Sequence, residues 1–154
     1  MNEKYRRILV PYDGSRFSRM ALDEAIEIAK KFDSDLYLLT VMDALTVAPP
    51  AFYAIPGAIF DIKKFEKYYR AATSKTDLVL RDEVLRCKEQ GTHADYEIMT
   101  GVPGDTILEF AKKKKIDLII MGSQGLSGIR KIKALGSISR KVSELAVCPV
   151  LIVR

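Results

Sequence analysis

Histidine, cysteine and tryptophan are scarce in this chain. Its 154 residues include one histidine (His93), two cysteines (Cys87 and Cys148) and no tryptophan. Two cysteines provide neither a disulfide framework nor the ligand spacing of a zinc site, so we expect a reducing, cytoplasmic environment. A Ser–His–Asp triad is not expected either, because His93 is remote in sequence from any serine in a G-x-S-x-G elbow. We therefore predict neither a protein-ligated metal nor a catalytic centre.

Long hydrophobic runs and two common nucleotide motifs are also missing. The first 14 residues are mostly polar and lack the apolar core of a signal peptide, and no stretch approaches the length of a membrane span. The chain contains no G-x-x-x-x-G-K-[ST] and no G-x-G-x-x-G after a strand. A P-loop, a dinucleotide site and a membrane partner are therefore not expected.

The composition is that of a folded globular protein. Apolar residues make up 48% of the chain and charged residues 29%, and the length suits one domain over residues 1–154. The net charge of +5 allows nucleotide or nucleic-acid partners. We interpret Lys112–Lys115 as a solvated cap at the end of a helix. The cluster of Arg130, Lys131 and Lys133 lies between glycines and is a better candidate for binding.

Short apolar runs alternate with amphipathic segments along the chain. Most of the runs are continuous, as in parallel strands that are covered on both faces, and the third, Ala94–Thr100, is weaker. This alternation predicts a single doubly wound, five-stranded parallel sheet with helices on both faces. The predicted strands are Arg7–Pro11, Leu36–Val41, Ala94–Thr100, Leu118–Met121 and Val150–Val153. Helices are predicted over Phe17–Phe32, Asp61–Gln90, Pro103–Lys115 and Ser137–Ala146.

The stretch Asp43–Asp61 is irregular, with three prolines among several large apolar residues. It is too apolar for an ordinary solvated loop. Two interpretations stay open, a flap that packs on its own domain and a contact surface for a partner.

A glycine-rich segment follows the fourth predicted strand. Gly122 and Gly125 form a G-x-x-G, and Gly136-Ser137 precedes the last predicted helix. Glycines let backbone amides approach an anion, and a helix N-terminus adds free N–H groups. The same residues could simply turn the chain, Ser137 could be an N-cap, and Asp13 could be a turn residue. Because Asp13 and Gly122 both end strands of one sheet, we favour a shared phosphate-binding crevice.

These residues carry a resemblance to a known family. The segments RILVPYDGSRFSRMAL, DLIIMGSQG and CPVLIVR resemble the universal stress protein family, in order and across the whole chain. The ATP-binding branch of that family has G-x-x-G, nine residues and then G-[ST]. Here ten residues separate Gly125 from Gly136. The resemblance implies a Rossmann-like fold, similar to the adenine nucleotide alpha hydrolases, and ATP with bridging Mg²⁺ or Mn²⁺.

The resemblance also implies a role for individual residues. Pro11, Asp13 and Val41 would contact the nucleoside, with Asp13 at the ribose and the Val41 backbone at the adenine. The ribose and phosphates would be held by the glycine-rich segment and the helix that follows it, through Gly122, Ser123, Gly125, Gly136, Ser137, Ile138 and Ser139.

The resemblance further implies a homodimer and a function. The last strand, within Pro149–Arg154, would pair with its counterpart in a second subunit, which protects an apolar edge. We expect a nucleotide-dependent switch or sensor in stress response that contacts a further protein partner and hydrolyses ATP slowly at most. Two alternatives stay open: a nucleotide-free interaction module of the same fold, and RNA or DNA binding through the G-x-x-G loop.

Overall fold

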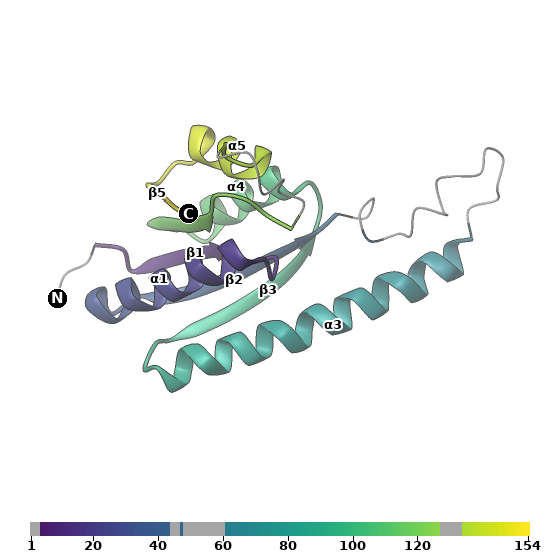
Figure 1. Ribbon diagram of the computed structural model, residues 1–154, viewed down its shortest axis with the longest axis horizontal. Helices are drawn as coiled ribbons and strands as arrows, with labels where there is room; N and C mark the ends of the chain where they lie inside the picture. Colours follow the sequence, from purple (N-terminus) through teal and green to yellow (C-terminus); the bar gives the residue numbers. More distant parts are fainter. Residues whose placement is uncertain (1–3, 44–46, 48–60, 127–133) are drawn as a thin grey trace.

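The computed structural model describes residues 4–43, 47, 61–126 and 134–154 (Figure 1). Five strands form one parallel sheet in the order β3-β2-β1-β4-β5. The strands are β1 (Arg7–Pro11), β2 (Asp35–Met42), β3 (Ala94–Thr100), β4 (Leu118–Gly122) and β5 (Val150–Val153). The helices described between them are α1 (Arg16–Phe32), α3 (Ile62–Glu89), α4 (Pro103–Lys113) and α5 (Ser137–Leu145).

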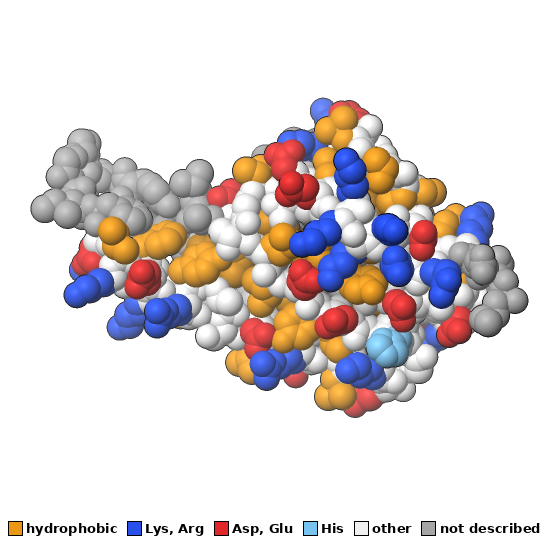
Figure 2. Space-filling model, turned by 180° about the vertical axis from the view of Figure 1, so that it is seen from behind, with side chains coloured by type: hydrophobic (Ala, Val, Ile, Leu, Met, Phe, Trp, Pro, Cys, Tyr) orange, Lys and Arg blue, Asp and Glu red, His pale blue; other side chains and the backbone are white. Residues whose placement is uncertain are grey.

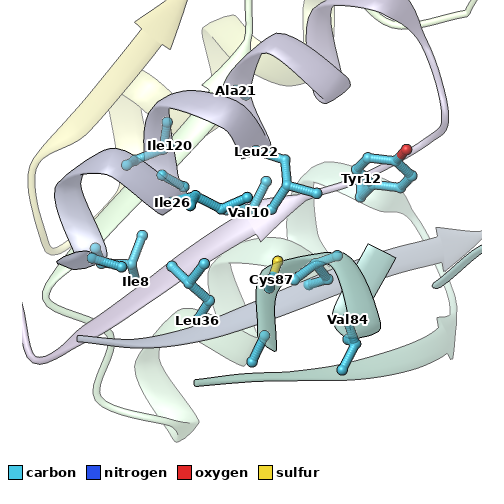
Figure 3. Packing of buried hydrophobic residues seen from close by; sticks show 14 of the residues in the cluster. Ile8, Val10, Tyr12, Ala21, Leu22, Ile26, Leu36, Val84, Cys87 and Ile120 are labelled. Carbon is cyan, nitrogen blue, oxygen red and sulfur yellow. The ribbon is translucent and has the colours of Figure 1, made fainter. Parts of the chain in front are cut away.

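Helices cover both faces of the sheet, which confirms the predicted doubly wound fold. On one face, α1 and α3 pack against the strands through a cluster that includes Ile8, Val10, Leu36 and Cys87 (Figure 3). On the other face, α4 and α5 pack on a second cluster that includes Leu9 and Leu39. Neighbouring residues of β1 and β2 thus enter opposite cores, as the pleat of a strand requires.

Local signals in the sequence fix the ends of the helices. The side chain of Ser15 accepts a hydrogen bond from the Ser18 amide and caps α1, and α1 ends at Asp33 with φ of 55°. Asp61 caps α3 through the Lys64 amide. The predicted helix Pro103–Lys115 ends at Lys113 instead, because Lys115 adopts the left-handed conformation with φ of 52°.

The lysine run at the end of α4 is only partly the solvated cap that the sequence predicts. Lys112, Lys113 and Lys115 are exposed. The Lys114 ammonium instead lies 2.8 Å from Oε1 of Glu97 and above the rings of Tyr37 and Phe110. Its hydrogen bond and charge interaction with Glu97 raise the pKa of Lys114. Lys114 therefore joins α4 to the sheet edge.

Two predictions concern residues outside the described part of the chain. The irregular stretch Asp43–Asp61 falls largely in residues 44–46 and 48–60, and the basic cluster Arg130, Lys131 and Lys133 falls in residues 127–133.

Candidate ligand-binding site

A pocket opens at the carboxyl ends of the central strands. Its enclosed volume is about 130 Å³. The strands are parallel, so the carboxyl ends of β1, β2 and β4 meet at this edge, and α1, α4 and α5 each add residues to the wall. The lining residues are Pro11, Tyr12, Asp13, Ser18, Leu39, Val41, Pro103, Ile107, Met121, Gly122, Gln124, Gly125, Ile138 and Ser139.

The end of β1 is held firmly to β2. The Tyr12 amide donates a 2.8 Å hydrogen bond to the Leu39 carbonyl, and the Thr40 hydroxyl donates to the Tyr12 carbonyl at 2.6 Å. The Tyr12 side chain is 4% exposed and belongs to the core that faces α1 and α3. Its neighbours Pro11 and Asp13 line the pocket. Tyr12 thus fixes the part of the backbone that forms one wall.

Asp13 connects the loop after β1 to the glycine-rich loop after β4. Its Oδ1 atom accepts a 2.9 Å hydrogen bond from the Ser15 amide, and its Oδ2 atom accepts one of 3.1 Å from the Leu126 amide. A Cβ atom at Gly125 would lie 2.8 Å from Oδ2. Glycine at position 125 therefore permits the close approach of the carboxylate, and the two loops are joined at the pocket.

Glycine is required at position 122 for a different structural reason, the packing of α1 on β4. A Cβ atom there would lie 2.6 Å from Cβ and 2.7 Å from the carbonyl carbon of Phe17, so the first turn of α1 rests directly on the end of β4. The Gly122 carbonyl accepts a 2.9 Å hydrogen bond from the Ser139 hydroxyl. This glycine serves the packing of helix on strand, and its carbonyl joins β4 to α5.

The two ends of the ten-residue segment between Gly125 and Gly136 lie side by side. The Gly136 amide donates a 2.8 Å hydrogen bond to the Ser123 carbonyl, and Nε2 of Gln124 donates to the Ala134 carbonyl at 3.1 Å. The residues that flank the segment are therefore in contact, although the segment is one residue longer than in the family pattern.

The N-terminus of α5 faces this region without a side-chain cap. Gly136 is the N-cap residue and offers no side chain to the helix. Among the described residues, the amides of Ser137, Ile138 and Ser139 have no hydrogen-bond acceptor, whereas the Arg140 amide bonds to the Gly136 carbonyl. Ile138 and Ser139 also line the pocket. Free amides at the positive end of a helix favour an anion.

The structure brings most of the predicted site residues together. Three of them do not line the pocket: Ser123 is buried, Gly136 is half-buried, and Ser137 is exposed at the start of α5. The residues in the pocket wall are Pro11, Asp13, Val41, Gly122, Gly125, Ile138 and Ser139. Their role as ligand contacts stays a prediction.

Several wall residues were missed by sequence reasoning. Tyr12, Leu39, Met121 and Gln124 adjoin predicted site residues or strand ends, and that position is a signal that could have found them. Ser18, Pro103 and Ile107 lie on helices that the order of strands brings over the pocket, so nothing in their local sequence marks them.

The charged groups of the site form no metal centre within the described ranges. No group of three or more His, Cys, Asp or Glu side chains there is suited to hold a metal ion.

No helix in the described part of the chain is long and apolar enough to cross a membrane.

The fold and the pocket define a parallel α/β protein with a crevice at the carboxyl edge of its sheet, the usual ligand site of this class. The model of the universal stress protein family matches residues 4–154, and the chain belongs to that family.

Individual relatives agree with this assignment. A universal stress protein of Methanocaldococcus jannaschii is 37% identical over 150 residues, which cover 97% of this chain and 82% of that protein. The structure of UspA from Lactobacillus plantarum is 28% identical with a TM-score of 0.83, over 99% of this chain and 100% of that chain. A universal stress protein in complex with cAMP is 26% identical with a TM-score of 0.69, over 98% of both chains.

Proposed function

We propose that the chain binds an adenine nucleotide in this pocket, with ATP as the physiological ligand, and acts as a nucleotide-dependent switch or sensor in stress response. The observation that carries the proposal is the joint position of the Asp13 carboxylate and the α5 N-terminus. Asp13, Ile138 and Ser139 line the pocket, so a hydrogen-bond acceptor lies near a helix N-terminus whose first amides have no acceptor among the described residues. A ribose needs the former and a phosphate the latter.

The division of the pocket supports a nucleotide over a simple anion. Pro11, Leu39, Val41 and Ile107 give an apolar wall that suits a purine base, whereas the glycine-rich loop and α5 give amides. The enclosed volume of about 130 Å³ is below the ~300–1,000 Å³ typical of whole-ligand sites. We therefore place the base inside and the phosphates outside, toward Ser137. The related structure in complex with cAMP supports the nucleotide class.

A divalent cation fits this arrangement through the nucleotide. The described residues offer no carboxylate cluster, and Mg²⁺ is commonly held by substrate phosphates with few protein ligands. Bound Mg²⁺ or Mn²⁺ would neutralise phosphate charge. The protein's own residues would bind the sugar at Asp13 and the phosphates at the α5 amides.

A homodimer through β5 belongs to the same proposal. β5 is an edge strand, and the apolar side chains of Leu145, Val147 and Leu151 are 59%, 77% and 37% exposed around it. Pairing of β5 with a second copy would satisfy the strand edge and bury this surface.

Denaturation of the purified protein tests the ligand directly. We expect ATP to be released in near-stoichiometric amount and to rebind, as measured by calorimetry with and without Mg²⁺. The matched variants are Asp13→Ala, which should lower ATP affinity about tenfold or more, and Asp33→Ala, which removes a carboxylate outside the pocket and should leave it unchanged.

Two other results would refute the proposal. An empty protein that also ignores added ATP would indicate a nucleotide-free interaction module. Salt-sensitive oligonucleotide binding without ATP competition would indicate a nucleic-acid site, although the G-x-x-G here leaves strand β4, unlike a KH loop, which connects two helices.

A further inference from the structure

The outward face of α3 carries apolar side chains that nothing in the described structure covers. Leu78 is 63% and Leu85 is 56% exposed, and Ala71 is exposed as well. These three residues are spaced by seven, so they follow one strip along the helix, opposite the buried residues Leu80, Val84 and Cys87. The helix lies along the outside of the molecule (Figure 1). We call Ala71, Leu78 and Leu85 the α3 strip.

The charges of α3 are distributed unevenly about this strip. Residues 62–75 contain five cations and one anion, a net charge of +4, whereas residues 76–89 contain three cations and four anions, a net charge of −1. Lys and Arg side chains gather along the projecting end of the helix (Figure 2). Among the described residues, no ion pair holds Lys67, Lys75, Asp82 or Glu89, and all four are exposed.

We propose that α3 is a self-association surface on which a second copy of the chain packs its own α3 in antiparallel orientation, with a two-fold axis at Leu78. Ala71 and Leu85 lie seven residues on either side of Leu78. The axis therefore sets Leu78 against Leu78 and each Ala71 against Leu85 of the other copy. A large side chain thus meets a small one at both ends of the strip, which allows close packing.

The same register pairs opposite charges. Lys67 and Glu89 lie eleven residues before and after Leu78, so each Lys67 meets Glu89 of the other copy. Lys75 and Asp82 lie three residues before and four after Leu78, on the same side of the strip, and they also meet. Arg81, which is paired with Asp77 at 2.8 Å, faces Ser74. No pair of like charges is set directly opposite along the strip.

This charge pattern identifies the occupant. A parallel pairing would set Lys75 against Lys75 and the two +4 halves side by side, which is repulsive. A polyanion would attract the first half of the helix but would leave Leu78 and Leu85 uncovered beside Asp82 and Glu89. A second copy in antiparallel orientation alone matches both the apolar strip and the two signs of charge.

The contact does not depend on the proposed nucleotide and does not compete with β5 pairing. α3 packs on β3 and β2, at the edge of the sheet opposite β5 (Figure 1). One pair of helices buries less surface than the ~1,200–2,000 Å² of a stable interface. We therefore expect reversible association that depends on protein concentration.

Cysteine cross-linking tests the register, in a Cys148→Ser background that leaves only the buried Cys87. Leu78→Cys should form a disulfide-linked dimer on mild oxidation. Val79→Cys is the matched control, because its side chain is 42% exposed but lies about 100° round the helix. A mixture of Ala71→Cys and Leu85→Cys should give the mixed dimer. Equal cross-linking at position 79, or Ala71→Cys dimers alone, would overturn the proposal.

Charge reversal tests the pairing in solution by sedimentation velocity. Lys75→Glu should weaken association about tenfold or more, and adding Asp82→Lys should restore it. Leu78→Lys should abolish it, with unchanged thermal unfolding of the single subunit. If β5 also pairs with a second copy, these variants should convert a tetramer to a dimer. If β5 does not pair, they should convert a dimer to a monomer. A different result would refute the proposal. If Asp82→Lys did not restore association, and if Lys75→Glu lost binding to anionic vesicles or oligonucleotides, the face would instead bind a polyanion.

Discussion

The hydroxyl of Tyr12 donates a 2.7 Å hydrogen bond to Oε1 of Glu83 and so connects the wall of the pocket to helix α3. Glu83 also accepts a 2.7 Å hydrogen bond from Nε of Arg86, and Arg86 reaches Asp23 on α1 at 2.7 Å. These hydrogen bonds join the residue after β1 to α3 and α1. Because Tyr12 stands between Pro11 and Asp13, this network holds the backbone of the candidate site in place.

Replacing Tyr12 by phenylalanine tests that connection. Tyr12→Phe removes the donor while keeping the ring in the core. Glu83 retains Arg86, so the free energy of unfolding should fall by about 1–2 kcal/mol. Urea denaturation measures it. Tyr5→Phe is the control, because its ring packs on Phe32 and its hydroxyl bonds to no described residue. An equal loss in both variants would show that the Glu83 contact contributes nothing.

The same hydroxyl predicts a pH dependence. Burial, followed by the hydrogen bond to Glu83, raises the pKa of Tyr12 above its ordinary range. A group whose pKa is raised by folding contributes stability that is complete below its unfolded pKa and is lost as pH rises. Above about pH 10 the unfolded chain ionises at Tyr12 first. The stability difference between wild type and Tyr12→Phe should therefore shrink from pH 9 to 11, and a constant difference would contradict this.

Strand runs and helix ends were predictable because each depends on local chemistry. Arg7–Pro11 was predicted with the observed bounds, since a buried parallel strand requires a continuous apolar run. Ala94–Thr100, a weaker segment that forms the edge strand β3, was also predicted with its observed bounds. The sequence predicted a helix that begins at Asp61 and ends before Gly91, and in the structure these two residues flank α3. The wall residues Pro103 and Ile107 were not predictable, because only the crossing of α4 over β2 places them at the pocket.

The structural roles of the two glycines of the G-x-x-G could not be predicted from the sequence. Sequence alone gives Gly122 and Gly125 one shared reason, room for a phosphate. In the structure Gly122 lies against the Phe17 backbone, and Gly125 lies against the Asp13 carboxylate. That difference depends on contacts with the loop and helix after β1, more than a hundred residues earlier in the chain. The spacing of the glycines in the sequence therefore does not reveal that they make different contacts.

These different contacts predict that alanine at the two glycines has different effects. Gly122→Ala places Cβ 2.7 Å from backbone that cannot easily move, so the free energy of unfolding should fall by about 1–3 kcal/mol or more. Gly125→Ala meets the end of a side chain that can rotate and should cost about 1 kcal/mol or less in stability. Its larger effect should be weaker ATP binding in calorimetry. A similar loss of stability in both variants would contradict this distinction.

Asp13→Asn tests the connection between the two loops. The carboxylate accepts from the Ser15 and Leu126 amides, one with each oxygen. Asparagine has one oxygen and an NH₂ group, so a donor would face a donor at one of the two contacts. We expect about 1–2 kcal/mol of lost stability and faster hydrogen exchange at Leu126.

The control for that variant is Asp33→Asn. Asp33 ends α1 with φ of 55°, a conformation that asparagine adopts readily, so stability should be unchanged or slightly higher. Unchanged exchange at Leu126 in Asp13→Asn would show that the carboxylate does not hold the glycine-rich loop.

The two thiols should differ in reactivity by a large factor. Cys87 on α3 is fully buried, and burial raises the pKa of its thiol to about 11. Cys148, before β5, is half-buried, and burial also raises its pKa. The thiolate is the reactive form, so a disulfide reagent at pH 8 should modify Cys148 first and Cys87 about a hundredfold more slowly or slower still. Cys148→Ser isolates the slow phase, which urea should accelerate in parallel with unfolding. Rapid modification of Cys87 in the native protein would show that α3 separates from the sheet without global unfolding.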